Sequence, residues 1–152
     1  MMSVSSLLQL IVVVISSYLS SSNSQEKFAS VTDVSVSGNE GSYNFSVTLS
    51  SPDNGCKQYA DWWEVVSEDG ELLYRRILFH SHVNEQPFTR SGGKVDIKED
   101  QLVWIRAHMN NTGYGGAAMM GSAKGGFTVT KWPENLGTNL DQVQPLPKGC
   151  NF

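Results

Sequence analysis

Three histidines are the residues of this chain whose type and spacing best suit metal coordination. His80 and His82 are separated by one serine, and positions two apart on a β-strand point the same way. His108 ends a later strand-like run that should reach the same end of a sheet. Three imidazoles gathered there would suit zinc or copper. The alternative is that all three are ordinary histidines at the polar rim of a domain.

A turn at Asp69-Gly70, between two strand-like runs, predicts a β-hairpin rich in aromatic residues and arginine. With this turn, Glu64 opposes Arg75 and Trp63 opposes Arg76. The first pair suits a cross-strand ion pair, and the second places a cation over an aromatic ring.

Both faces of this hairpin are largely apolar, and each carries one arginine. One face holds Trp62, Glu64, Val66, Leu73, Arg75, Ile77 and Phe79, and the other holds Trp63, Val65, Leu72, Tyr74, Arg76, Leu78, His80 and His82. The metal hypothesis needs the histidine face outward, which buries the Glu64–Arg75 pair at a desolvation cost. The opposite orientation leaves that pair in water. An exposed aromatic face is typical of a binding surface, unless the tail over residues 132–150 covers it.

The predicted function is that of a secreted, non-enzymatic module that binds an extracellular protein or glycan through this hairpin and the loop over residues 81–90. Aromatic and arginine anchors dominate the energetics of recognition. The residues predicted to hold the partner are Trp63, Tyr74, Arg76, Trp104 and Arg106. The alternative function is an extracellular zinc or copper protein that uses His80, His82 and His108. A structural role in an extracellular matrix is a third hypothesis.

Signatures of common enzyme classes are absent from the sequence. It has no Gly-x-Ser-x-Gly, no His-Glu-x-x-His, no phosphate-binding glycine loop and no dinucleotide fingerprint. The glycine-rich residues 113–126 precede no helix whose N-terminus could bind phosphate, and they predict a long loop with an irregular strand. Carboxylates around the hairpin turn are most simply solvated. We therefore expect no catalytic activity and no required cofactor.

The first 24 residues have the pattern of a secretory signal peptide. No charged side chain precedes Glu26, and the short apolar run over residues 7–15 is followed by a serine-rich stretch. Cleavage before Gln25 would release an extracellular protein that is not inserted in a membrane. The alternative is an uncleaved membrane anchor.

Export predicts a disulfide between Cys56 and Cys150, the only two cysteines. This bond would tie the tail over residues 132–152 back to a domain over residues 25–131. Two sequons, at Asn44 and Asn110, would accept glycans where the source glycosylates its exported proteins.

Apolar and polar residues alternate along most of the remaining chain, as in half-buried strands. Seven strand-like runs span residues 31–36, 43–49, 61–66, 72–82, 94–97, 102–109 and 126–131. The chain has 152 residues, 39% of them hydrophobic, and a net charge of −4, as expected of a single domain. Its 11 Lys and Arg residues are scattered, so a nucleic acid partner is not expected. The fold predicted is all-β, a single antiparallel two-sheet sandwich, with a jelly roll as the runner-up.

The strand count, the tryptophan-bearing third run and residues 102–116 resemble fibronectin type III and immunoglobulin-like domains. Residues 102–116 look like the sixth strand and following loop of a fibronectin-type module. The resemblance implies a sandwich architecture and no particular activity. The cysteines depart from the immunoglobulin pattern, in which a disulfide joins the second and sixth strands, because Cys150 lies in the tail.

Overall fold

The computed structural model describes residues 26–151, so the predicted signal peptide over residues 1–24 lies outside the described residues. The described chain contains eight β-strands and one short 3-10 helix. The strands are β1 (Ser30–Asn39), β2 (Ser42–Ser50), β3 (Ala60–Ser67), β4 (Leu72–Ile77), β5 (Phe88–Val95), β6 (Val103–Met109), β7 (Ala118–Ser122) and β8 (Gly126–Thr130), and the helix is η1 (Leu140–Gln142).

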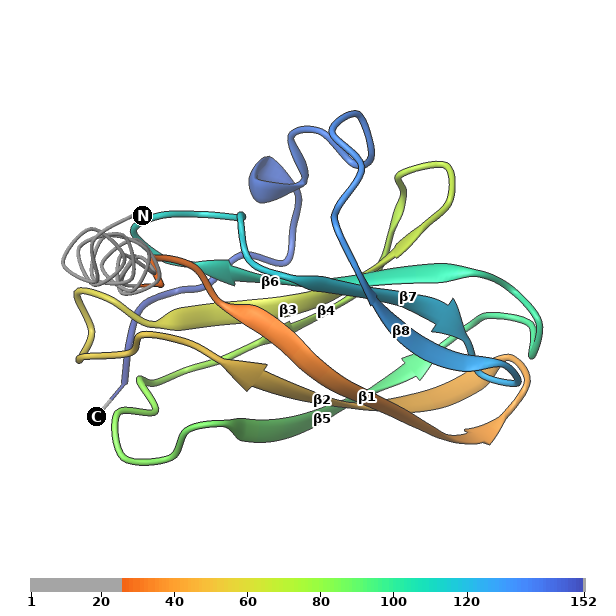
Figure 1. Ribbon diagram of the computed structural model, residues 1–152, viewed down its shortest axis with the longest axis horizontal. Coiled ribbons are helices and arrows are strands. Elements are labelled where there is room, and N and C mark those ends of the chain that lie inside the picture. The colour runs from red at the N-terminus through yellow and green to blue at the C-terminus, as the bar shows by residue number, and fades with distance from the viewer. Residues whose placement is uncertain (1–25, 152) are drawn as a thin grey trace, which may run out of the picture.

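The strands form two antiparallel sheets packed face to face (Figure 1). One sheet has the order β1-β2-β5, and the other has the order β4-β3-β6-β7-β8. Inward-facing side chains from both sheets fill the space between them, as the alternating pattern predicts. Phe45, Val47 and Leu49 contribute from β2, while Val65 and Ile105 contribute from the facing sheet. The predicted antiparallel two-sheet sandwich is confirmed.

The glycine-rich residues 113–126 contain the strand that was expected there as irregular, and it adds an eighth strand to the seven predicted runs. Within them, β7 pairs with β6 and, through a tight hairpin, with β8. A side chain at Gly121 would collide with the backbone of Gly126, so the close approach of β7 and β8 requires glycine there. Two other boundaries also differ: β5 is Phe88–Val95, not residues 94–97, and β4 ends at Ile77.

The hairpin formed by β3 and β4 has the predicted register. Glu64 lies opposite Arg75 and Trp63 lies opposite Arg76, and a bulge beyond Val65 shifts the pairing next to the turn. All eight residues of β3 are buried. Trp63 and Val65 face the core between the sheets. The other face is buried too, which explains why the sequence shows no polar side for this hairpin.

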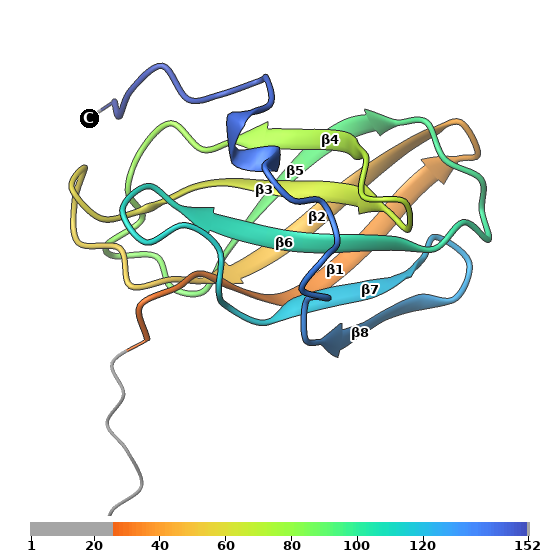
Figure 2. The ribbon, with the colours of Figure 1, turned by 90° about the horizontal axis from the view of Figure 1, so that it is seen from above.

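The C-terminal tail covers that other face. After β8 the chain crosses the outer side of the five-stranded sheet over β6, β3 and β4, with η1 in the middle of its path (Figures 1 and 2). A disulfide between Cys56 and Cys150, with Cα atoms 5.6 Å apart, fixes the end of the tail, as predicted. Next to it, the Asn151 amide donates a hydrogen bond to the carbonyl oxygen of Phe79 (2.6 Å).

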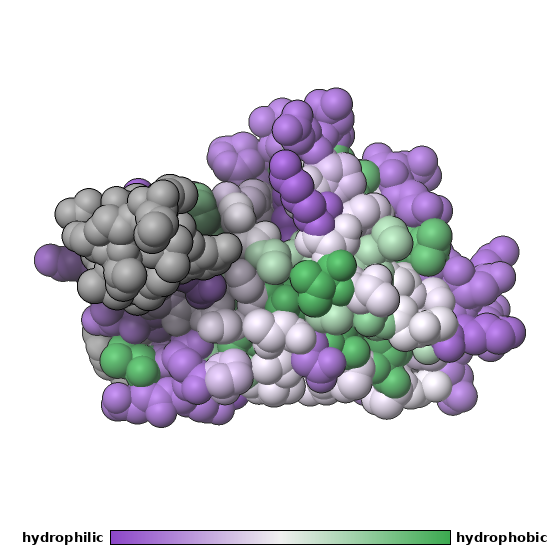
Figure 3. All heavy atoms as spheres, viewed as in Figure 1, coloured by the Kyte–Doolittle hydropathy of each residue, from purple (hydrophilic) through white to green (hydrophobic). Residues whose placement is uncertain are grey.

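Apolar side chains are also visible on the face of the molecule that carries β1 and β8 (Figure 3). Here the five-stranded sheet ends at β8, and Val129 on this edge strand is 65% exposed. Threonines flank Val129 on both sides. The short length of this strand, five residues, limits the tendency of the open edge to pair with other chains.

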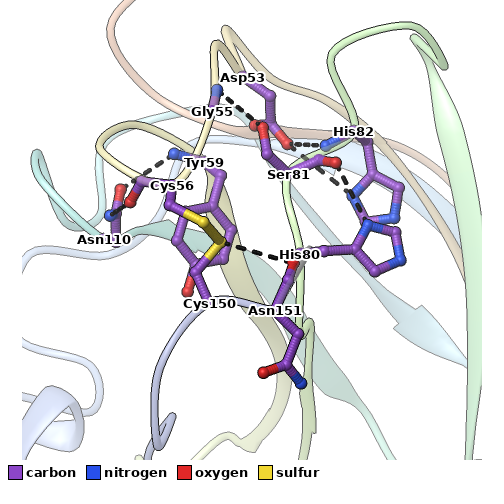
Figure 4. Close-up of a disulfide and its surroundings, with 10 residues drawn as sticks. All are labelled: Asp53, Gly55, Cys56, Tyr59, His80, Ser81, His82, Asn110, Cys150 and Asn151. Carbon is purple, nitrogen blue, oxygen red and sulfur yellow. Dashed lines mark hydrogen bonds and ion pairs between the residues drawn. A yellow bond between two sulfur atoms is a disulfide. The ribbon is translucent and has the colours of Figure 1, made fainter.

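The two sequon asparagines occupy different environments, although both are exposed. Asn44 lies within β2. The amide of Asn110 instead joins two segments: its Oδ1 accepts a hydrogen bond from the Tyr59 amide (3.0 Å), and its Nδ2 donates to the Cys56 carbonyl (3.0 Å) (Figure 4). Asn110 therefore holds the loop that carries the disulfide. Glycosylation at either asparagine stays a prediction.

Replacing Asn110 by alanine is expected to lower the free energy of unfolding by about 1–2 kcal/mol, because the buried Tyr59 amide loses its acceptor. The measurement is urea denaturation followed by circular dichroism. Asn111→Ala is the matched control, since Asn111 makes one exposed hydrogen bond to Gln58. Equal effects of the two substitutions would contradict the role assigned to Asn110.

Candidate recognition site on the five-stranded sheet

Alternate residues of β6 project from the outer face of the five-stranded sheet. Val103, Ile105, Ala107 and Met109 point into the core. Trp104, Arg106 and His108 therefore share the opposite face. Loop 110–117 and the tail add further aromatic rings to this face. The result is a band of aromatic rings and guanidinium groups across β6, β3 and β4.

Glu64 lies at the centre of this band and is fully buried. Its Oε2 accepts hydrogen bonds from the Nε of Arg75 (2.9 Å) and from the indole nitrogen of Trp62 (3.1 Å). Its Oε1 accepts one from the Nε of Arg106 (2.7 Å). One carboxylate thus holds two guanidinium groups in fixed positions. Charge-assisted bonds of this kind are stronger than bonds between neutral groups.

Arg75 fastens the tail to the sheet. Its guanidinium donates to the carbonyl oxygens of Leu140 (2.7 Å), Val143 (2.6 Å) and Pro145 (2.9 Å). The same group lies 4.3 Å from the centroid of the Trp62 ring. All the N–H donors of Arg75 form hydrogen bonds to other groups of the protein, so this arginine has a structural role.

Arg106 differs because it also lines an open hollow. Its guanidinium carbon lies 3.6 Å from the ring centroid of Tyr114 and 4.1 Å from that of Trp132. The hollow has a volume of about 360 Å³, and its wall includes Lys131 and Glu134 from the start of the tail. We call it the Arg106 hollow. Aromatic faces beside a held cation are the kind of surface that binds planar or polar groups of a partner.

Two neighbours complete the surroundings of the Arg106 hollow. The Tyr114 hydroxyl is buried and has no hydrogen-bond partner among the described residues. Burial, together with the nearby charge of Glu64, raises the pKa of the Tyr114 phenol, so it keeps its proton as a donor. Trp104 packs edge-on against Trp132, with ring centroids 6.0 Å apart.

The five predicted binding residues are divided between separate places. Trp63 is 0% exposed in the core, so its predicted role as a surface anchor is wrong. Tyr74 packs on Trp63 and lies over Gly92 of the other sheet. Arg76 donates to the carbonyl oxygens of Ser91 and Ile77. Trp63, Tyr74 and Arg76 thus belong to the inner face of the hairpin or its edge.

Trp104 and Arg106 do share a surface, together with two residues that the sequence reasoning did not select. Tyr114 and Trp132 complete the aromatic surroundings of Arg106. Trp132 begins the tail over residues 132–150, which covers the outer face of the hairpin. The sequence signal that could have indicated Trp132 is a tryptophan at the start of a tail expected to cover an aromatic face.

The predicted three-histidine metal cluster is not formed. His108 donates from Nδ1 to Asp61 (2.7 Å) and stacks on Trp62 with centroids 3.6 Å apart. His80 and His82 lie beyond the end of β4, where His82 stacks on Phe88 of the three-stranded sheet. Within residues 26–151, no group of three or more His, Cys, Asp or Glu side chains could hold a metal ion. The prediction failed because it extended β4 to His82.

The fold and this face together define a small two-sheet β-sandwich, compatible with fibronectin type III and immunoglobulin-like architecture, with a charged aromatic band under a disulfide-tied tail. No family model matches the chain, and no solved structure matches it. The chain is 41% identical over 110 residues to a protein of Halomicrobium mukohataei that is named "Putative lipoprotein". The match covers 70% of this chain and 54% of that protein, so the chain spans about half the length of this curated relative. Among the described residues, no helix has the length and apolar character needed to cross a membrane.

Proposed function

We propose that this protein is an extracellular, non-enzymatic binding module that recognises a protein or carbohydrate through the Arg106 hollow. This proposal moves the recognition surface from the hairpin, whose outer face is sealed by the tail, to β6 and the start of the tail. The observation that carries it is the position of Arg106, held by a buried carboxylate and lying between two aromatic rings at the wall of an open hollow.

The rigidity of the Arg106 hollow supports a role in binding. The Nε of Arg106 bonds to Glu64, and one terminal nitrogen donates to the Gly137 carbonyl (3.2 Å). The indole nitrogen of Trp132 donates to the Leu136 carbonyl (2.9 Å). Side chains that are already ordered lose little conformational entropy when a partner binds. The exposed Lys131 supplies a further donor at the rim.

An extracellular location fits three independent features. The first 24 residues have the pattern of a signal peptide. The cysteines form a disulfide, which is typical of exported proteins. The relative from Halomicrobium mukohataei carries a name that describes a lipoprotein. We propose that this chain likewise acts outside the cell.

The test is a screen of the purified, disulfide-bonded protein against a glycan array and a panel of secreted proteins, followed by titration of the best partner. Lys131→Ala and Trp132→Ala should each weaken binding about tenfold or more, the loss typical of an interface hot spot. Lys94→Ala is the matched control, because Lys94 is an exposed lysine on β5 of the other sheet. Melting temperatures show whether each variant is folded.

Three results would overturn the proposal. The first is that neither screen yields a partner. The second is that folded Lys131→Ala and Trp132→Ala variants bind as the parent does. The third is that Lys94→Ala weakens binding as much as the two hollow variants.

A further inference from the structure

A second hollow lies beyond the C-terminal end of β4, beside the disulfide, and has no part in the function proposed above. It has a volume of about 540 Å³. Its wall is formed by residues 80–85, together with Gly55 and Asn151. Figure 4 shows His80 and His82 side by side on this wall, with both rings projecting away from the disulfide.

His82 is buried, but its ring nitrogens lack hydrogen-bond partners within residues 26–151. The residue is 4% exposed, yet neither Nδ1 nor Nε2 has a hydrogen-bond partner among the described residues. One face of the ring stacks on Phe88, with centroids 3.8 Å apart and planes within 8°. Buried polar groups nearly always have partners. An imidazole held in place with both nitrogens unused is therefore ready to bind a ligand.

The surroundings of both rings place the protons on Nδ1. The Nδ1 of His80 lies 3.2 Å from the Ser81 carbonyl oxygen, which can only accept, so Nδ1 is the donor in the neutral ring. The Nδ1 of His82 lies 3.8 Å from Oδ2 of Asp53, and this negative oxygen favours a proton on the same atom. Both Nε2 atoms then keep a free lone pair. Metal-binding histidines are oriented by a carboxylate or carbonyl in this way.

The loop holds His82 firmly at the main chain as well. The backbone amide of His82 donates to Oδ2 of Asp53 (2.8 Å). Oδ1 of the same carboxylate accepts from the Ala60 amide (2.9 Å) and from the Ser51 hydroxyl (2.7 Å). Asp53 thus connects the loop that carries the histidines with the start of β3. A ligand would meet a preformed site.

We propose that the Nε2 atoms of His80 and His82 bind one copper ion in this hollow. The ring centroids lie 4.5 Å apart, and both residues line the same hollow. The donor set differs from the predicted trio, because His108 takes no part.

Two imidazole donors favour copper over zinc. A structural zinc site uses four protein ligands and a catalytic one uses three. The carboxylate on the wall, that of Glu85, accepts two hydrogen bonds from Arg90. Copper(II) is bound more tightly by nitrogen donors than the other divalent metals of its row, and it accepts a tetragonal arrangement completed by water.

The test is calorimetric titration of the disulfide-bonded protein with Cu(II) at neutral pH, together with electron paramagnetic resonance of the complex. We expect one ion per chain and a spectrum that shows two coordinating nitrogens. His80→Ala should weaken binding at least about tenfold, and His80 is exposed, so this variant should fold. His82→Phe should do the same while it retains an aromatic ring on Phe88.

His108→Asn is the matched control and should bind copper as the parent does, because His108 stacks on Trp62 on the outer face of the five-stranded sheet, outside this hollow. The proposal is overturned if the parent takes up no copper, if folded His80→Ala binds unchanged, or if His108→Asn loses binding equally. These outcomes are separate from partner binding at the Arg106 hollow, since Lys131→Ala should leave copper uptake intact.

Discussion

Glu64→Gln is expected to lower the free energy of unfolding by about 3–5 kcal/mol, the usual cost of breaking a buried ion pair. Glutamine has nearly the shape of glutamate but no charge. Arg75, whose side chain is fully buried, and Arg106, whose side chain is 9% exposed, would then lie close together without a compensating anion. A loss of this size is a large part of the stability of a typical domain.

The measurement is urea denaturation of parent and variant. Their midpoint concentrations are compared after the dependence of the unfolding free energy on urea is shown to be the same for both. Glu85→Gln provides the control, because Glu85 pairs with Arg90 at the surface and its loss should leave the midpoint almost unchanged. If Glu64→Gln unfolds at the same urea concentration as the parent, then tail carbonyls alone hold the arginines, and the central role of Glu64 is wrong.

Removing the disulfide should have an effect of similar size. The double variant Cys56→Ser and Cys150→Ser opens a link between residues 94 apart, and the chain-entropy model gives a loss of about 4–5 kcal/mol for a loop of that order. The tail should also become looser than the sheets, because its remaining attachments to Arg75 and Arg106 are hydrogen bonds to four carbonyls.

Denaturation and amide hydrogen exchange together test this expectation. Faster exchange should be confined mainly to η1 and its flanks, where the amides of Gln142 and Val143 bond within the tail. The core strand β6 should remain protected in the folded state. Unchanged exchange in the tail would show that the arginine contacts suffice to hold it.

The local features of the fold could be predicted from the sequence. Which face of the β3–β4 hairpin points into the core could not be predicted. Asp69-Gly70 marks the turn of the hairpin, and Glu64 pairs with Arg75 as predicted, although a bulge beyond Val65 shifts the pairing next to the turn. Which face of β3 points inward depends on where distant segments pack. The two faces have similar apolar content, so the pattern alone leaves both orientations open, and the tail decides between them.

The candidate site shows the same limit. Arg106 and its place on the outer face follow from the alternation along β6. Its aromatic neighbours, Tyr114 and Trp132, come from a loop and from the tail, whose routes no periodicity encodes. The predicted cluster of three histidines is wrong for a local reason. β4 ends at Ile77, and the chain leaves the sheet before it reaches His80.

The bond between Cys56 and Cys150 also determines how the molecule would bear tension between its ends. A pull applied at residues 26 and 151 passes along β1 and β2 to Cys56, and then directly across the sulfur atoms to the tail. Strands β3 to β8 and η1 lie within the closed covalent loop and carry no load through their own backbone. Residues 26–56 can span roughly 100 Å at full stretch. The five-stranded sheet, with the Arg106 hollow on it, is therefore mechanically shielded while the disulfide is intact.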